Sequence, residues 1–296
     1  MKWILRWLWR ASPGIRRAFA NKVSDAVVGE PRLAAKFYPY LPEQSSYQVK
    51  TDGRRSDPRA DLEIPPQDLW WGYADRPESY LAAGKDYVVK MKKVLEDAGT
   101  PLQSYKRILD FGCGSGIMIR WLHENALSGE VWGVDISGAH MLWCQQHMSP
   151  PFKFATTTSF PHLPFEDGYF DFVYAGSVFT HIADLVEAWL MELRRIVRPG
   201  GRLYLTVHDE HTIDLFMKDT EHATGAMLRA HDREAHFTTA SYDFFTVNRT
   251  PGEGGAGQAQ VFHHTDYLQR HWSRYLKIVS ITPESYWYQS AVLLEK

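Results

Sequence analysis

Residues 107–116, RILDFGCGSG, and residues 131–135, VWGVD, decide the fold class of this chain. In the first stretch an apolar run reaches a carboxylate, Asp110, and a glycine-spaced turn then leads into a predicted helix over residues 117–123. In the second stretch an apolar run ends at Asp135. Glycines let a backbone approach a ligand closely, and an acid at the second strand end suits ribose hydroxyls. The two stretches therefore predict the first half of a nucleotide-binding α/β unit.

The glycine spacing and the position of Asp110 indicate which nucleotide binds. A dinucleotide fingerprint has the form G-x-G-x-x-G/A, because a pyrophosphate lies on the helix N-terminus. Here the glycines run G-x-G-x-G, and Ile117 fills the last fingerprint position. A carboxylate beside the loop would repel a diphosphate but attract a ligand with positive charge. S-adenosylmethionine carries a sulfonium, an ammonium and no phosphate, so the local electrostatics favour it over NAD or FAD.

Four sequence blocks occur in a familiar order: the glycine loop after Asp110, the acid Asp135, LPFxxGxFD over residues 163–171 and LRRxxRPGG over residues 193–201. With these blocks the chain resembles a class I S-adenosylmethionine-dependent methyltransferase over about residues 85–296. The resemblance implies an enzyme with S-adenosylmethionine as its cofactor. A single glycine loop would be weak support, whereas four ordered blocks are specific.

Strands and helices alternate along the core, which predicts a parallel sheet with right-handed crossovers. The expected strands are residues 107–111, 130–134, 152–155, 170–175 and 202–206, with helices over 77–98 and 184–197. Residues 275–281 and 288–294 resemble the family's final antiparallel pair. The fold class is thus α/β: a doubly wound, mostly parallel seven-stranded, Rossmann-like sheet with an antiparallel last strand. An N-terminal helical extension and a cap after strand five complete it.

The domain organisation follows from composition. Residues 1–66 form an N-terminal amphipathic segment and a polar, proline-rich linker, and residues 67–296 form the methyltransferase domain. Within it, residues 208–272 are too long for a simple connection and hold eight of the 13 histidines. This segment emerges above the carboxyl ends of the strands, where ligands bind. We therefore expect it to be a substrate cap, with the glycine-rich residues 251–257 as a mobile tip.

The first 22 residues contain six Lys or Arg and no acid, with Trp3 and Trp7 on one side at helical spacing. The apolar run is too short to span a bilayer and makes a poor secretory signal. An interfacial helix on anionic lipid fits this chemistry. A helix packed on the domain or on a second copy fits equally well, and an arginine-rich transit peptide is a third reading.

Overall composition excludes several function classes. A chain of 296 residues with 44% hydrophobic residues can bury one large core. A formal net charge of −2 provides no field that would recruit nucleic acid, and no Asn/Asp-Pro-Pro-Tyr motif follows strand four. Two cysteines make no disulfide framework and suit a reducing compartment. We expect a cytoplasmic protein, with peripheral attachment to a membrane left open by the N-terminal segment.

The resemblance assigns cofactor contacts to the glycine loop. Asp110 and the amides of Gly112 and Gly114 are expected to hold the methionine end. Gly116 is expected to keep helix and strand close, and Cys113 is a small residue inside the loop rather than a nucleophile. These five residues form the first part of the predicted cofactor site.

Five further residues complete that predicted site. Asp135 is expected to bind the ribose hydroxyls, and Ile136 to lie along the adenine. The family often has an acid after strand three for the adenine amino group, but this chain has a run of hydroxyl residues, so Thr157 is assigned there instead. Tyr73, from the segment before the core, and Ser177, just past strand four, are expected near the methionine end.

His181 is the best candidate for catalysis. It ends the segment GSVFTH, residues 176–181, just past strand four, where the carboxyl-end crevice faces the transferred methyl group. A neutral imidazole could remove a proton from an acceptor hydroxyl at physiological pH. The alternative is that His181 caps the following helix or orients the substrate.

A metal site is considered and not predicted. Residues 208–211, HDEH, could ligate a divalent ion. However, Gly176 and Ser177 stand where metal-assisted methyltransferases need a further acid after strand four. A loop that contacts substrate or solvent is the preferred interpretation.

The leading functional prediction is methyl transfer to a small-molecule hydroxyl, on a sugar, glycolipid or natural product. Two alternatives remain. One is N- or S-methylation, which needs no general base. The other is a non-catalytic, cofactor-binding partner subunit, against which the intact Asp110, glycine loop and Asp135 argue.

Overall fold

The computed structural model describes residues 62–70, 72–182, 185–235, 244–248 and 259–296. The predicted N-terminal amphipathic segment, most of the linker and the glycine-rich residues 251–257 lie outside the described residues. Among the residues that are described, no helix is both long enough and apolar enough to cross a bilayer.

The core is a seven-stranded sheet with the order β3-β2-β1-β4-β5-β9-β8. Its strands are β1 (Arg107–Phe111), β2 (Glu130–Asp135), β3 (Lys153–Thr156), β4 (Phe170–Ala175), β5 (Val197–Val207), β8 (Lys277–Tyr286) and β9 (Gln289–Glu295). Strands β1 to β5 pair in parallel, and β9 is antiparallel to both β5 and β8. The predicted doubly wound sheet with an antiparallel last strand is confirmed.

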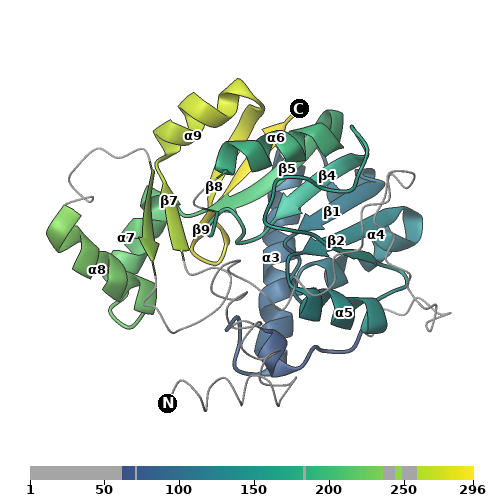
Figure 1. The fold of residues 1–296 in the computed structure, drawn as a ribbon, viewed down its shortest axis with the longest axis horizontal. Coiled ribbons are helices and arrows are strands. Elements are labelled where there is room, and N and C mark those ends of the chain that lie inside the picture. The colour runs from purple at the N-terminus through teal and green to yellow at the C-terminus, as the bar shows by residue number, and fades with distance from the viewer. Residues whose placement is uncertain (1–61, 71, 183–184, 236–243, 249–258) are drawn as a thin grey trace, which may run out of the picture.

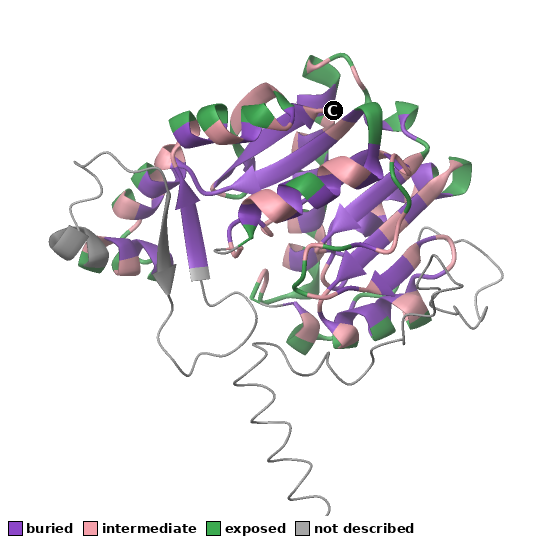
Figure 2. Ribbon diagram, turned by 45° about the horizontal axis from the view of Figure 1, so that its top comes forward, coloured by how far each residue is buried: buried purple, intermediate pink, exposed green. Residues whose placement is uncertain are grey.

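Helices cover both faces of this sheet (Figure 1). One face holds α3 (Pro77–Asp97), α4 (His123–Ser128) and α5 (Gly138–His147), and the other holds α6 (Val186–Ile196), α9 (Thr265–His271) and the turn η5 (Trp272–Arg274). Because side chains alternate along a strand, Ile108 of β1 enters the first core and its neighbour Leu109 enters the second. The strands are consequently buried on both sides (Figure 2), which explains their near-continuous apolar sequence.

The predicted helix over residues 117–123 differs from the structure. A 3₁₀ turn, η4 (Ile119–Leu122), comes first, and α4 follows it. The glycine turn continues through Gly116, whose φ of 85° is incompatible with a right-handed helix. Helix α3 also crosses here at close range, since a Cβ on Gly84 would lie 2.1 Å from the carbonyl oxygen of Ile117.

The part of the chain between β5 and α9 forms a small unit of its own, on the left in Figure 1. It contains α7 (Glu210–Lys218), α8 (Ala223–Ala235) and the antiparallel pair β6 (Phe244–Asn248) and β7 (Ala259–His263). A separate apolar cluster of Ile213, Phe216, Leu228 and Phe262 holds it together. It contacts the loop after β4, where the amide of Val261 donates to the carbonyl of Thr180 at 2.9 Å.

Candidate active site

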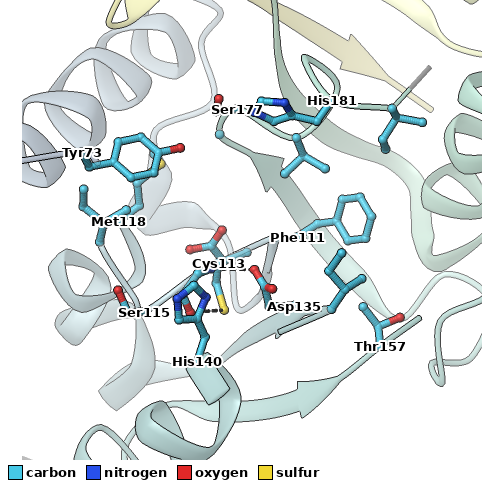
Figure 3. Close-up of a pocket in the computed structure, with 18 of the residues that line it drawn as sticks. Tyr73, Phe111, Cys113, Ser115, Met118, Asp135, His140, Thr157, Ser177 and His181 are labelled. Atoms are coloured by element: carbon cyan, nitrogen blue, oxygen red, sulfur yellow. Dashed lines mark hydrogen bonds between the residues drawn. The ribbon is translucent and has the colours of Figure 1, made fainter. Parts of the chain in front are cut away.

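A cavity of about 540 Å³ opens at the carboxyl ends of β1, β2 and β4 (Figure 3). Ten of the predicted site residues line it: Tyr73, Asp110, Gly112, Cys113, Gly114, Asp135, Ile136, Thr157, Ser177 and His181. Parallel strands end at the same edge of a sheet, so residues that are far apart in the sequence meet there. The predicted cofactor residues and the predicted base thus share one cavity.

Gly116 is the predicted site residue that does not line this cavity. It faces Met148 instead, whose Sδ would lie 2.7 Å from a Cβ at this position. The requirement for glycine is therefore set by packing behind the turn and by a φ of 85°.

The amides of Gly112 and Gly114 also differ from the prediction. The amide of Gly112 donates to the carbonyl oxygen of Val134 at 2.8 Å, and the amide of Cys113 donates to the same oxygen at 3.0 Å. The amide of Gly114 donates to Oδ2 of Asp135 at 2.8 Å. These amides therefore bind the turn to β2 and are not directed at a ligand. Glycine is required at 112 because φ is 79° and a Cβ would lie 2.3 Å from Cγ2 of Val178.

Asp135, at the end of β2, is buried and organises the turn. Its Oδ2 accepts from the amide of Gly114 at 2.8 Å, and its Oδ1 accepts from the amide of Ser137 at 2.7 Å. A carboxylate accepts hydrogen bonds only, so its place at the cavity suits the hydroxyl groups of a ligand. The backbone oxygen of Asp135 accepts from the amide of Thr157 at 2.9 Å, which brings the end of β3 to the cavity.

Asp110, at the end of β1, is a buried carboxyl group with a relative exposure of 2%. Burial raises its pKa to about 8, and the nearby negative charge of Asp135 adds to this. The hydroxyl of Tyr174 donates to its Oδ2 at 2.8 Å and offsets part of the rise. Neither Lys nor Arg occurs among the described residues that line the cavity. A buried carboxyl in such surroundings fits a ligand that brings its own positive charge.

His181 lies on the loop after β4. Its amide donates to the carbonyl oxygen of Val178 at 2.9 Å, which closes a tight turn and places the imidazole beside the cavity (Figure 3). Behind it lies His208, which is fully buried and stacks on Phe262 with ring centroids 4.9 Å apart. Burial holds the pKa of His208 well below its ordinary value, and His181 and other neighbouring histidines lower it further.

Several cavity residues were not predicted from the sequence: Leu69, Trp70, Ser115, Met118, His140, Trp189 and Tyr286. Ser115 lies inside the glycine loop, and its hydroxyl donates to the carbonyl of Leu69 at 2.8 Å and lies 2.9 Å from the hydroxyl of Tyr80. The segment before the core is thereby tied to the glycine turn. Tyr286 comes from the C-terminal hairpin and meets Tyr73 edge to face at 6.4 Å.

The described part of the predicted substrate cap, residues 208–272, contributes none of the residues that line the cavity. Residues of the HDEH segment make contacts within the protein. Asp209 caps α7 by accepting from the amide of Thr212, and His211 lies 2.9 Å from Glu284. Within the described ranges, no three His, Cys, Asp or Glu side chains are grouped as a metal site would require.

Comparison with known proteins gives the class. Residues 109–205 match the family described as "Methyltransferase domain". Together with the sheet order, the glycine turn and the two strand-end acids, this match defines a class I S-adenosylmethionine-dependent methyltransferase. Residues 109–205 thus form a domain of this family, and the predictions of the family, of an enzyme and of S-adenosylmethionine as the cofactor agree with this match.

Three relatives illustrate the range of similarity. A 37.1 kDa uncharacterized protein in transposon TN4556 of Streptomyces fradiae is 31% identical over 51% of this chain and 46% of its own length. An uncharacterized methyltransferase of Schizosaccharomyces pombe is 29% identical, covering 51% and 56%. Phthiotriol/phenolphthiotriol dimycocerosates methyltransferase 1 of Mycobacterium ulcerans is 29% identical, covering 54% and 57%. The chain thus spans about half the length of these relatives.

The names of further relatives differ in the acceptor. They include demethylmenaquinone methyltransferases, a malonyl-[acyl-carrier protein] O-methyltransferase and a tRNA U34 carboxymethyltransferase. Membership of the family therefore leaves the acceptor open.

Proposed function

We propose that this protein transfers the methyl group of S-adenosylmethionine to a hydroxyl group of a small, uncharged acceptor. The observation that carries the proposal is the single cavity in which a buried carboxyl group, Asp110, and a strand-end histidine, His181, both take part. The first suits a cationic cofactor, and the second suits removal of a proton.

The cofactor end of the cavity supports specific roles. The carboxylate of Asp110 would pair with the ammonium of the methionine end, and the carboxylate of Asp135 would accept from the ribose hydroxyls. Ile136 would lie along the adenine, and the hydroxyl of Thr157 would bind its polar edge. Tyr73 would contact the methionine end of the cofactor, and its hydroxyl lies on the side of the cavity where Ser177 lies (Figure 3).

The affinity for S-adenosylhomocysteine, the cofactor product, should depend on pH. The pKa of Asp110 is raised to about 8, so the free protein holds a proton there at neutral pH. The product's ammonium pairs with the ionised form, and this proton must leave on binding. Affinity should therefore rise as pH increases from 6 to 8, by up to about tenfold per unit.

Calorimetry in buffers of different ionisation enthalpy would measure both the affinity and the proton release. Asp110→Asn should abolish the pH dependence and weaken binding at pH 8. A flat affinity between pH 6 and 8 in the parent protein would remove the proposed ion pair.

At the acceptor end, His181 is proposed as the general base. S-adenosylmethionine, when bound, supplies a methyl group activated by its sulfonium. The imidazole of His181 would take the proton of the acceptor hydroxyl as that oxygen becomes methylated, and would later release it to water. Tyr73 would help to hold the acceptor oxygen, because its hydroxyl lies on the same side of the cavity as His181 (Figure 3). N- or S-methylation would not need this proton transfer.

The lining supports an uncharged acceptor with an apolar body. Large apolar side chains such as Trp70, Phe160 and Trp189 line the cavity, whereas its described residues include two carboxylates and neither Lys nor Arg. An anionic acceptor would meet repulsion without a compensating cation. Glycolipids and natural products with a free hydroxyl meet both requirements, and neutral sugars meet the requirement for no charge.

Methyl-labelled cofactor and matched pairs of acceptors would test this proposal. Each pair would contain a neutral hydroxyl compound and its carboxylated or phosphorylated counterpart. We expect labelled methyl ethers, with kcat/KM at least about tenfold higher for the neutral member. Label on nitrogen or sulfur, or preference for the anionic member, would contradict the proposal. Tight product binding without any turnover would favour a non-catalytic subunit. Contact of residues 1–22 with a membrane or a second copy stays a prediction from the sequence.

A further inference from the structure

We propose that Gln289, at the start of the antiparallel strand β9, is a positioning residue that holds the loop carrying Ser177 and His181 in its reactive geometry. The proposal rests on the proposed methyl transfer. Gln289 is not among the residues that line the cavity, so it would act through Ser177 and not by contact with a ligand.

Three residues form a closed ring of hydrogen bonds. The amide of Ser177 donates to Oγ1 of Thr206 at 2.7 Å, and this hydroxyl donates to Oε1 of Gln289 at 2.6 Å. Nε2 of Gln289 then donates to Oγ of Ser177 at 2.8 Å. The ring joins the end of β4 to β5 and β9, and both Thr206 and Gln289 are buried, with relative exposures of 0% and 3%.

This ring holds Ser177 in a conformation that a serine rarely adopts. Its φ is 57°, in the left-handed region that glycine adopts readily and that is unfavourable for a residue with a Cβ. Such a conformation persists only when the surrounding structure fixes it. Gln289 and Thr206 do this by satisfying both the amide and the hydroxyl of Ser177.

The turn at Ser177 determines the position of the residues that follow. Val178 comes next, and its Cγ2 lies against Gly112 of the glycine turn, where a Cβ would be only 2.3 Å away. The carbonyl of Val178 in turn accepts from the amide of His181 at 2.9 Å. Thr180 fixes the far side of the loop, since its Oγ1 lies 3.1 Å from Oγ of Ser177 and its carbonyl accepts from Val261 of β7. A change at Ser177 would therefore move His181 relative to the cofactor loop.

Gln289→Met removes both hydrogen bonds at nearly constant volume and should lower kcat more than cofactor affinity. Methyl transfer requires an in-line approach, and a displacement of about 1 Å can reduce a rate by ~10²-fold. We expect kcat to fall about 10- to 100-fold. The dissociation constant of S-adenosylhomocysteine should change less than about threefold, because Asp110 and Asp135 lie on β1 and β2, outside the ring.

A rescue variant separates positioning from general damage. Ser177→Gly in the Gln289→Met background supplies a residue that adopts a positive φ without hydrogen bonds to a side chain. The kcat of this double variant should be at least about fivefold higher than that of Gln289→Met. Ser290→Ala is the matched control, since Ser290 is the next residue of β9 and is fully buried, and its hydroxyl has no hydrogen-bond partner among the described residues. This control should keep kcat within about twofold of the parent.

Hydrogen exchange of the peptide covering residues 176–181 provides a readout that needs no acceptor. Gln289→Met should speed exchange in this peptide at least about tenfold and leave residues 107–116 unchanged, and Ser290→Ala should alter neither. Any of three results would overturn the inference. Exchange could be unchanged in Gln289→Met, or its kcat could stay within about twofold of the parent. The third result is an equal loss in kcat and cofactor affinity that Ser177→Gly does not rescue. If the parent methylates no acceptor, the proposed function fails, while the exchange result still decides whether Gln289 holds the loop.

Discussion

Asp135→Ala should weaken the binding of S-adenosylhomocysteine by about tenfold to more than a hundredfold. Charge-assisted hydrogen bonds are worth ~1.5–3 kcal/mol each, and about 1.4 kcal/mol corresponds to a factor of ten. The variant loses the proposed ribose contacts and also the acceptor of the Gly114 amide, which Asp135 holds at 2.8 Å. Calorimetry at constant pH would measure the change.

Two variants separate ligand contact from loop support. Asp135→Asn keeps an oxygen that can accept from the amide of Ser137 but cannot accept with both atoms, so it should give an intermediate loss. Asp171→Asn is a matched control on another strand, where the carboxylate accepts from the amides of Lys106 and Arg107, each at 2.8 Å. It should lower stability by about 1–3 kcal/mol and leave affinity within about twofold. Unchanged affinity in Asp135→Ala, or tight NADH binding by the parent, would contradict the assigned cofactor site.

The sequence predicts the central strands well because local pattern and burial agree there. Residues 107–111 and 170–175 were predicted as strands, and these are the bounds of β1 and β4. Both are short apolar runs bounded by turn residues, and both are covered by helices on two sides. The glycine turn follows directly on β1 and Asp135 ends β2, so most of the predicted cofactor residues reach the cavity.

The remaining parts of the site depend on contacts between distant segments. Tyr286 and Gln289 belong to the C-terminal hairpin, and their proximity to Ser177 results from the pairing of β5 with β9. No local periodicity reports that register. Similarly, the amide of Gly112 was expected to face a ligand, but only the tertiary structure reveals that the carbonyl of Val134 accepts from it.

The predicted role of residues 208–272 as a substrate cap stays a prediction. Its length and position after β5 favour this role, but its described residues support the cavity wall from behind and do not line it. Support of this kind is visible at Thr180, whose carbonyl accepts from Val261 of β7. The segment thus already contributes to the loop that carries His181, whichever acceptor binds.

His181→Ala should lower kcat by about 10²- to 10⁴-fold, the usual contribution of a general base. Cofactor affinity should remain within about threefold, because the proposed cofactor contacts lie at the ends of β1, β2 and β3. His181→Gln, which can orient a hydroxyl but cannot take its proton at neutral pH, should be nearly as slow. His211→Ala is the control, since His211 is a partly exposed histidine that pairs with Glu284 away from the cavity lining.

The pH profile decides whether His181 accepts a proton or only orients the acceptor. In the parent, kcat should fall as the pH is lowered through the range in which histidines ordinarily titrate, and His181→Gln should lose this limb. Neither His208 nor His263 can cause this fall in kcat. Burial keeps the pKa of His208 well below that range and lowers the pKa of His263 to about 4. His140 also lines the cavity, but it lies beside Ser115 and Cys113 at the cofactor end (Figure 3), away from the proposed site of proton transfer. A variant at His181 with normal turnover would leave positioning alone as the source of the rate, or indicate an acceptor that needs no deprotonation.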